Sequence, residues 1–196
     1  MGILETIKNE LNNFTWVNRY KEYLSLREKG LKKAAQTEIE KFILDFYRQN
    51  KSDRRNFIDL IYRIGKEAND YTLYVPYNLS NQVIALELED WRKDEPQNPI
   101  PFRWSLDFHL LQKSIEIDPV DQTTLELFFT LLCNRISMNQ HEIEFGYPYD
   151  GNADDDYALI NKYEGYVENI SDLHKREKIK ESLAEIKKVA LQNIRK

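Results

Sequence analysis

The sequence predicts an all-α fold of about eight helices, and three observations lead to that prediction. Apolar residues recur three and four positions apart along most of the 196 residues, which is the period of an amphipathic helix. Only six glycines and six prolines are present, fewer than a turn-rich all-β fold requires. The apolar fraction of 41% and the charged fraction of 31% allow a buried core beneath a polar surface. We expect one helical domain over residues 1–196; if it subdivides, N-terminal helices occupy 1–70 and C-terminal layers occupy 78–196.

Residues 16–48 are expected to form an antiparallel helical hairpin. Aromatic residues share one side of its first helix, and Gly30 stands where glycine commonly ends a helix in a left-handed conformation. Ala34 and Ala35 follow the turn, and such small side chains let two helices approach closely. The apolar stripe of the second helix then continues to Phe46.

Two further helices are expected before residue 92, with Ser52 and Ser80 as their N-caps. Between these helices, residues 71–75 have the composition of a β-strand. Pro76 ends that run, and proline is excluded from the interior of a sheet. We therefore predict an extended connector over residues 71–75.

A proline-rich loop separates these helices from the next pair. Pro101 suits the first turn of a helix whose inward stripe runs from Trp104 to Ile115. Asp118-Pro119 ends that helix, because proline lacks an N–H donor and restricts the residue before it. The following helix, from about residue 121 to residue 138, is the most apolar and is expected to be central.

An irregular segment over residues 141–156 precedes the last two helices. Asp154-Asp155-Asp156 supplies acidic charge where a helix N-terminus favours it. Ser171 is the predicted cap of the final helix, whose apolar stripe continues to Ile194.

Charge and composition exclude several classes of function. The 28 basic and 33 acidic residues are interspersed and give a net charge of −5, so we expect no nucleic-acid partner. No signal peptide and no apolar run of transmembrane length occurs, which predicts a cytoplasmic protein with no membrane partner. The one cysteine, Cys133, lies in an apolar run and is expected to be an inert core thiol.

The acidic loop resembles a calcium-binding loop only in part. Asp150, Asn152 and Asp154 stand at its first, third and fifth positions, but Asp155 replaces the required glycine. Asn161 stands where a bidentate glutamate should close the coordination shell. A carboxylate-rich helix cap is the favoured interpretation, with a weak cation site at the first three residues as the alternative. We expect no cofactor.

Catalytic motifs are sparse, and the alternative of a metal-dependent enzyme depends on few residues. His141-Glu142 could be half of a zinc motif, but Phe145 stands where the second histidine is needed. A site near His141, Asp150 and Asp154 would require distant ligands to meet in the fold. No nucleophile elbow, phosphate-binding loop or dinucleotide fingerprint is present, so binding is favoured over catalysis.

Twelve tyrosines and three tryptophans give the chain a large aromatic content, much of it near irregular segments. Such side chains either cover loop–helix junctions or serve as anchors in protein interfaces. Tyr147 and Tyr149 flank a proline in a loop, which favours the second role. The predicted binding residues are Tyr147, Tyr149, Arg103, His141 and Glu142.

Two stretches, 16–48 and 91–136, resemble degenerate tetratricopeptide hairpins through their helix pairs and the Asp118-Pro119 ending. A regular 34-residue period is missing. The combination of Pro101-Phe102-Arg103-Trp104, Asp118-Pro119 and His141-Glu142 with Gly146-Tyr147 is also similar to uncharacterised bacterial helical proteins. That group has no assigned activity, so the resemblance implies a fold and no function.

These observations predict a cytoplasmic protein–protein interaction module, such as a bacterial adaptor or a toxin-neutralising immunity protein. An acidic surface with loop tyrosines suits a basic protein partner. The metal-dependent enzyme and a self-associating oligomer are the alternatives. The sequence leaves the oligomeric state and the identity of the partner open.

Overall fold

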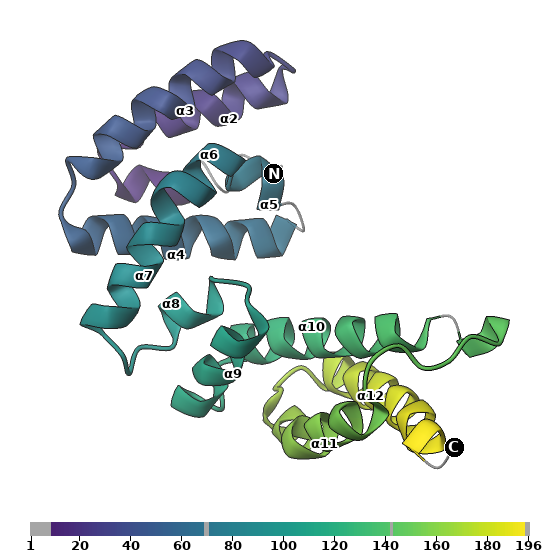
Figure 1. The fold of residues 1–196 in the computed structure, drawn as a ribbon. Helices are drawn as coiled ribbons and strands as arrows, with labels where there is room; N and C mark the ends of the chain where they lie inside the picture. Colours follow the sequence, from purple (N-terminus) through teal and green to yellow (C-terminus); the bar gives the residue numbers. More distant parts are fainter. Residues whose placement is uncertain (1–8, 69–70, 142, 195–196) are drawn as a thin grey trace. The chain divides into compact units, whose positions relative to one another are not determined.

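The computed structural model describes residues 9–68, 71–141 and 143–194 of the chain. Across these residues every regular element is a helix and no strand occurs, which confirms the all-α class (Figure 1). The chain forms two compact units, one ending at Pro96 and the other beginning at Gln97. That the whole chain is one folding domain stays a prediction. The possible subdivision into residues 1–70 and 78–196 also stays a prediction.

The N-terminal unit begins with a 3-10 turn, η1 (Leu11–Asn13), and a hairpin of α2 (Asn18–Glu28) and α3 (Lys32–Tyr47). The two helices lie side by side and antiparallel (Figure 1). Gly30 connects them at φ +74°, a conformation that strains residues with a Cβ atom. Ala35 is fully buried. The hairpin predicted over residues 16–48 is therefore confirmed.

Helix α4 (Lys51–Ala68) contributes Phe57, the centre of an aromatic cluster. Phe57 is fully buried, and each ring that surrounds it comes from the α2–α3 hairpin or from the residues just before α2. The neighbouring rings, with centroids 5.1–6.3 Å away, are those of Phe14, Trp16, Tyr20, Phe42 and Phe46. This cluster holds α4 against the hairpin and forms the core of the N-terminal unit.

The segment after α4 is helical, so the predicted extended connector over residues 71–75 is wrong. α5 (Tyr71–Tyr74) is closed by a bond from the Val75 N–H to the Tyr71 carbonyl at 2.7 Å. Gly65 gives this turn room, because a Cβ there would lie 3.0 Å from the Tyr71 ring. Tyr74 and Val75 are buried, and burial in a helical turn outweighs their β-propensity.

Three consecutive elements complete the N-terminal unit. Pro76 has an extended backbone and precedes α6 (Tyr77–Leu79). A π-helical turn, η2 (Ser80–Ile84), follows and leads directly into α7 (Ala85–Asp94). The expected helix ending near residue 91 is present, but it begins before Ser80.

The C-terminal unit starts with two helices where one was predicted. α8 (Ile100–Arg103) ends after a single turn, and α9 (Phe108–Ile117) follows. Leu106 between them has φ +51°, which no helix can contain. Asp107 then caps α9 by accepting a backbone N–H at 3.1 Å. Pro101 occupies the first turn of α8, as predicted.

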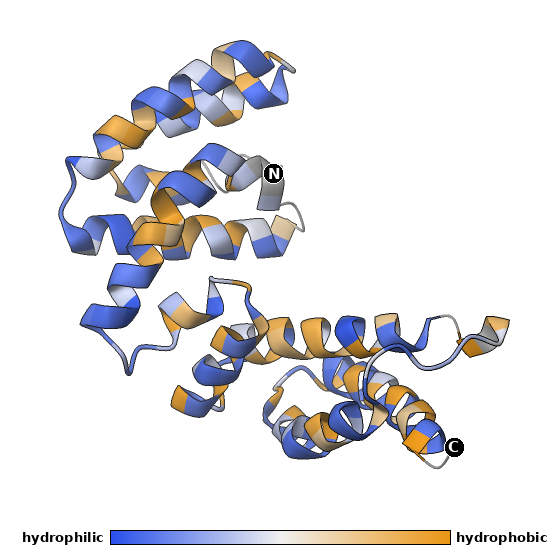
Figure 2. Cartoon of the chain, viewed as in Figure 1, coloured by the Kyte–Doolittle hydropathy of each residue, from blue (hydrophilic) through white to orange (hydrophobic). Residues whose placement is uncertain are grey.

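Helix α10 (Gln122–Gln140) packs against both α9 and α12 (Leu173–Ile194), while α11 (Ala153–Tyr163) packs against α12. The short 3-10 turn η3 (Ile143–Phe145) lies between α10 and α11, and η4 (Glu164–Asn169) lies between α11 and α12. Figure 2 shows hydrophobic residues recurring along α10 and α12. Phe128 of α10 lies fully buried among the core residues. The central position predicted for this helix is confirmed within the C-terminal unit.

None of the three predicted serine caps is used: two are replaced by nearby residues, and one lies within a helical run. Asn50, and not Ser52, accepts a backbone N–H of α4 at 2.9 Å. Asp172, and not Ser171, accepts a backbone N–H of α12 at 3.1 Å. Ser80 lies inside a continuous helical run and caps nothing. In each case the helix begins at a residue other than the one expected, so another residue stands at the N-cap or the serine lies within the helix.

Candidate functional site

The structure brings several of the predicted site residues together at the C-terminal end of α10. His141 follows the last residue of that helix, and its N–H donates to the Met138 carbonyl at 3.4 Å. A hollow of about 380 Å³ lies beside it. Its lining consists of Met138, Asn139, His141, Tyr147, Pro148, Tyr149 and Asp150. Three of the five predicted binding residues therefore share one site.

Hydrogen bonds hold the loop after His141 against the helices. The Asp150 N–H donates to the Asn139 carbonyl at 2.9 Å. The Tyr149 hydroxyl and the Asn139 side-chain amide both donate to Oδ2 of Asp156, at 2.7 and 2.8 Å. Asp156 is buried, so these donors replace the water that the carboxylate loses.

Gly151 allows the loop to pass close to α10. Its φ is +93°, and a Cβ there would lie 3.3 Å from the side-chain nitrogen of Asn139. Burial raises the pKa of Tyr149 to about 12, and the bond to Asp156 adds to the increase. Tyr149 is thus a neutral donor that anchors the loop, a role that its position beside Pro148 did not reveal.

Tyr147 differs from Tyr149 in its exposure. Its side chain is 60% exposed, and Met138 and Phe145 nearby in the chain are 75% and 69% exposed. We call Met138, Phe145 and Tyr147 the loop patch. Met138 and Tyr147 line the same hollow, and exposed large apolar side chains beside a hollow are typical of a contact surface.

His141 lies between two hollows. The second, about 470 Å³, extends toward α12. Its lining consists of Ser137, Gln140, His141, Ile143, Glu185, Ile186 and Val189. Gln140 fixes one wall, because its side-chain amide donates to the Ile186 carbonyl at 2.8 Å. His141 therefore contributes to the lining of both hollows.

Arg103 belongs to a different place. Its guanidinium pairs with Asp121 at the N-terminal cap of α10 and lies 4.8 Å from the ring centroid of Trp104. His141 is at the other end of α10, about 30 Å from Asp121 along the helix axis, since a helix rises about 1.5 Å per residue. Arg103 therefore shares no site with Tyr147. The predicted binding residue Glu142 lies outside the described residues.

The acidic loop serves as a helix cap. Oδ1 of Asn152 accepts the backbone N–H groups of Asp154 and Asp155 at 2.9 and 3.3 Å. Within the described part of the chain, no group of three or more His, Cys, Asp or Glu side chains is arranged to hold a metal ion. The favoured interpretation of residues 150–156 as a capped helix N-terminus agrees with this geometry.

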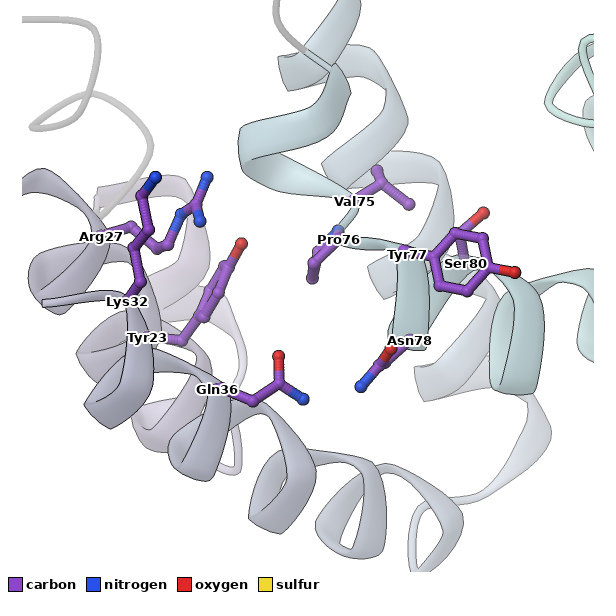
Figure 3. Close-up of a pocket in the computed structure, with 9 residues that line it drawn as sticks. All are labelled: Tyr23, Arg27, Lys32, Gln36, Val75, Pro76, Tyr77, Asn78 and Ser80. Carbon is purple, nitrogen blue, oxygen red and sulfur yellow. The ribbon is translucent and has the colours of Figure 1, made fainter. Parts of the chain in front are cut away.

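A third hollow, of about 470 Å³, lies in the N-terminal unit, and sequence reasoning did not predict it (Figure 3). We call it the hairpin groove, because α2 and α3 form one of its walls. Its lining consists of Tyr23, Arg27, Lys32, Gln36, Val75, Pro76, Tyr77, Asn78 and Ser80. Two local features of the sequence could have indicated this groove. One is Gly30, whose turn brings Arg27 and Lys32 to the same wall, and the other is Tyr77 beside Pro76.

Cys133 is half-buried beside α12, and burial raises the pKa of its thiol to about 11. A thiol with so high a pKa is a poor nucleophile at neutral pH, which agrees with the predicted inert role.

No protein-family model, curated protein or solved structure matches this chain. Among the described residues, none of the helices has the length and apolarity needed to cross a membrane.

Proposed function

We propose that this chain is a protein-binding module whose contact surface includes the loop patch. The finer architecture that we propose is a set of antiparallel hairpins of the tetratricopeptide type, of which the α2–α3 pair is the clearest example. A bacterial adaptor or an immunity-type protein of the cytoplasm would use such a module.

The observation that carries the proposal is an exposed apolar patch on an anchored loop. Tyr147 is 60% exposed, yet on its C-terminal side Tyr149 donates to Asp156 and the Asp150 N–H donates to the Asn139 carbonyl. An ordered loop loses little conformational entropy when a partner binds. Tyrosine adds large contact area with few rotatable bonds, which is why it is enriched at interface hot spots.

Charge indicates the kind of partner. The loop patch is followed by the exposed carboxylates of Asp150, Asp154 and Asp155, and Glu185 is exposed beside the second hollow. The chain as a whole carries a net charge of −5. A protein that presents a basic rim around an apolar centre would complement this surface and would be steered to it.

The test is affinity capture from a lysate of the source organism at moderate salt, with mass spectrometry of the retained proteins. Three baits are compared: the parent, Tyr147→Ala and Leu44→Ala. Leu44 is the matched control, because it is 62% exposed but lies on α3 of the N-terminal unit. We expect one stoichiometric protein on the parent and on Leu44→Ala, and about thirtyfold weaker binding to Tyr147→Ala.

Equal retention by all three baits would place the interface elsewhere and refute the assignment to the loop patch. Retention of nothing beyond the bait itself would argue against a binding module. Light scattering of the purified chain then tests the alternative that the patch contacts a second copy.

A further inference from the structure

The hairpin groove carries two cations that have no acidic partner among the described residues. Arg27 is in the last turn of α2 and Lys32 is the first residue of α3. The Gly30 turn brings both to the same wall, as Figure 3 shows. Neither side chain forms an ion pair with any described residue, and no described Asp or Glu lines the groove. This local excess of positive charge contrasts with the net charge of −5.

The remaining lining can bind a polypeptide backbone. Gln36 and Asn78 face one another across the groove (Figure 3). The Gln36 side-chain nitrogen donates to Glu40 at 2.8 Å, so its oxygen is left as an acceptor for a backbone N–H. The Asn78 amide makes no side-chain hydrogen bond with the described residues and offers both a donor and an acceptor.

The base of the groove is apolar and rigidly placed. Tyr23 and Val75 are buried, and Pro76 fixes the extended backbone of the opposite wall. The Tyr20 hydroxyl donates to the Tyr74 carbonyl at 2.5 Å and ties the two walls together. A space of about 470 Å³ accommodates a few residues of an extended chain.

We propose that the hairpin groove binds a short extended peptide segment of a partner protein through an internal Asp or Glu side chain. Arg27 provides two parallel N–H donors to the carboxylate, and Lys32 adds a second positive charge. Gln36 and Asn78 bind the flanking backbone. This site is separate from the loop patch and does not depend on the function proposed for it.

Other occupants fit less well. A nucleic acid would need a longer row of cations to contact several phosphates. The groove has two cations among the described residues, and the protein as a whole carries a net charge of −5. The Gln36 side-chain oxygen is an acceptor that a peptide N–H can use, whereas a phosphate oxygen has no proton to donate to it.

The test begins with selection of a displayed random heptapeptide library on the parent chain. Selected sequences are then synthesised with acetylated N-termini and amidated C-termini, so that any carboxylate belongs to a side chain. Fluorescence anisotropy measures their affinity for the parent, for Arg27→Gln/Lys32→Gln, and for the control Lys29→Gln/Lys33→Gln. The control removes two neighbouring exposed cations outside the groove and changes the net charge equally.

We expect enrichment of Asp or Glu at one position, and at least about tenfold weaker binding to the Arg27/Lys32 variant only. Asn78→Ala should weaken binding several-fold as well. Circular dichroism melting curves that match the parent exclude loss of folding as the cause.

Four results would overturn the proposal: no enriched peptide, enriched peptides without an acidic residue, binding that requires a free C-terminus, or equal weakening by both double variants. A single-stranded oligonucleotide that binds the parent and is lost with Arg27→Gln/Lys32→Gln would assign the groove to nucleic acid instead.

Discussion

Replacing Tyr149 by phenylalanine separates a structural anchor from a contact residue. The substitution keeps the ring and removes only the hydroxyl that donates to Asp156 at 2.7 Å. It also removes the acceptor that the Gln140 side chain contacts at 3.4 Å. Asp156 is buried, and after the change the side-chain amide of Asn139 is the donor that remains to it among the described residues. A buried carboxylate that loses one donor destabilises the fold.

The size of the effect follows from the exposure of the two partners. A hydrogen bond to a charged group contributes about 1.5–3 kcal/mol when both partners are buried. Tyr149 is half-buried, so water replaces part of the lost interaction. We expect the free energy of local opening around residues 139–160 to fall by about 1–2 kcal/mol.

Hydrogen exchange measured by mass spectrometry reports this region separately from the N-terminal unit. A loss of 1–2 kcal/mol corresponds to amide protection about 5- to 30-fold lower at the end of α10 and the start of α11. Tyr147→Phe is the matched control, because the Tyr147 side chain is 60% exposed and should change protection by less than about 0.5 kcal/mol. Equal protection in the parent and in Tyr149→Phe would refute the anchoring role.

Two further predictions concern titration and the N-terminal unit. Burial raises the pKa of Tyr149 and of Tyr71 to about 12 from 10.0, so the stability gained by keeping each phenol neutral is complete below pH 10 and is lost as the pH rises toward 12. In an ultraviolet titration of the phenols, Tyr149→Phe should remove amplitude near pH 12; amplitude lost near pH 10 would contradict the burial. Arg55 is buried and pairs with Glu87 at 3.3 Å, so Arg55→Met should cost about 3 kcal/mol in urea unfolding. Lys51→Met, which removes an exposed pair, should cost under about 1 kcal/mol, and equal costs would refute the argument.

Helix content was predictable because it depends on local periodicity. The Gly30 turn and the Asp118-Pro119 break fall where predicted, since glycine permits a left-handed backbone and proline prevents helical continuation. Residues 71–75 were mispredicted because their composition favours strands, whereas burial of Tyr74 and the space beside Gly65 favour a helical turn. Leu106 at φ +51° divides a helix that the apolar pattern presents as continuous.

The candidate site was predictable in part. Tyr147, Tyr149 and His141 are near in sequence, and the loop after α10 keeps them near in space. Their roles were not predictable, because exposure and hydrogen bonding depend on Asn139 and Asp156, which lie in helices on either side of the loop. Arg103 lies in α8, shortly before α10 in the sequence. Its guanidinium pairs with Asp121 at the N-terminal end of α10, whereas the loop tyrosines follow the C-terminal end.

The sequence by itself determined the all-α class, the Gly30 turn, the helix ending at Asp118-Pro119 and the acidic helix N-terminus at residues 154–156, because each depends on interactions within a few residues. Only the tertiary structure decided which side chains share a surface. The hairpin groove requires Arg27 and Lys32 to lie opposite Asn78. These residues are more than forty positions apart in the sequence, and helix packing brings them together. No local sequence pattern predicts that these side chains lie on one groove, since their placement depends on how the aromatic core around Phe57 positions the helices.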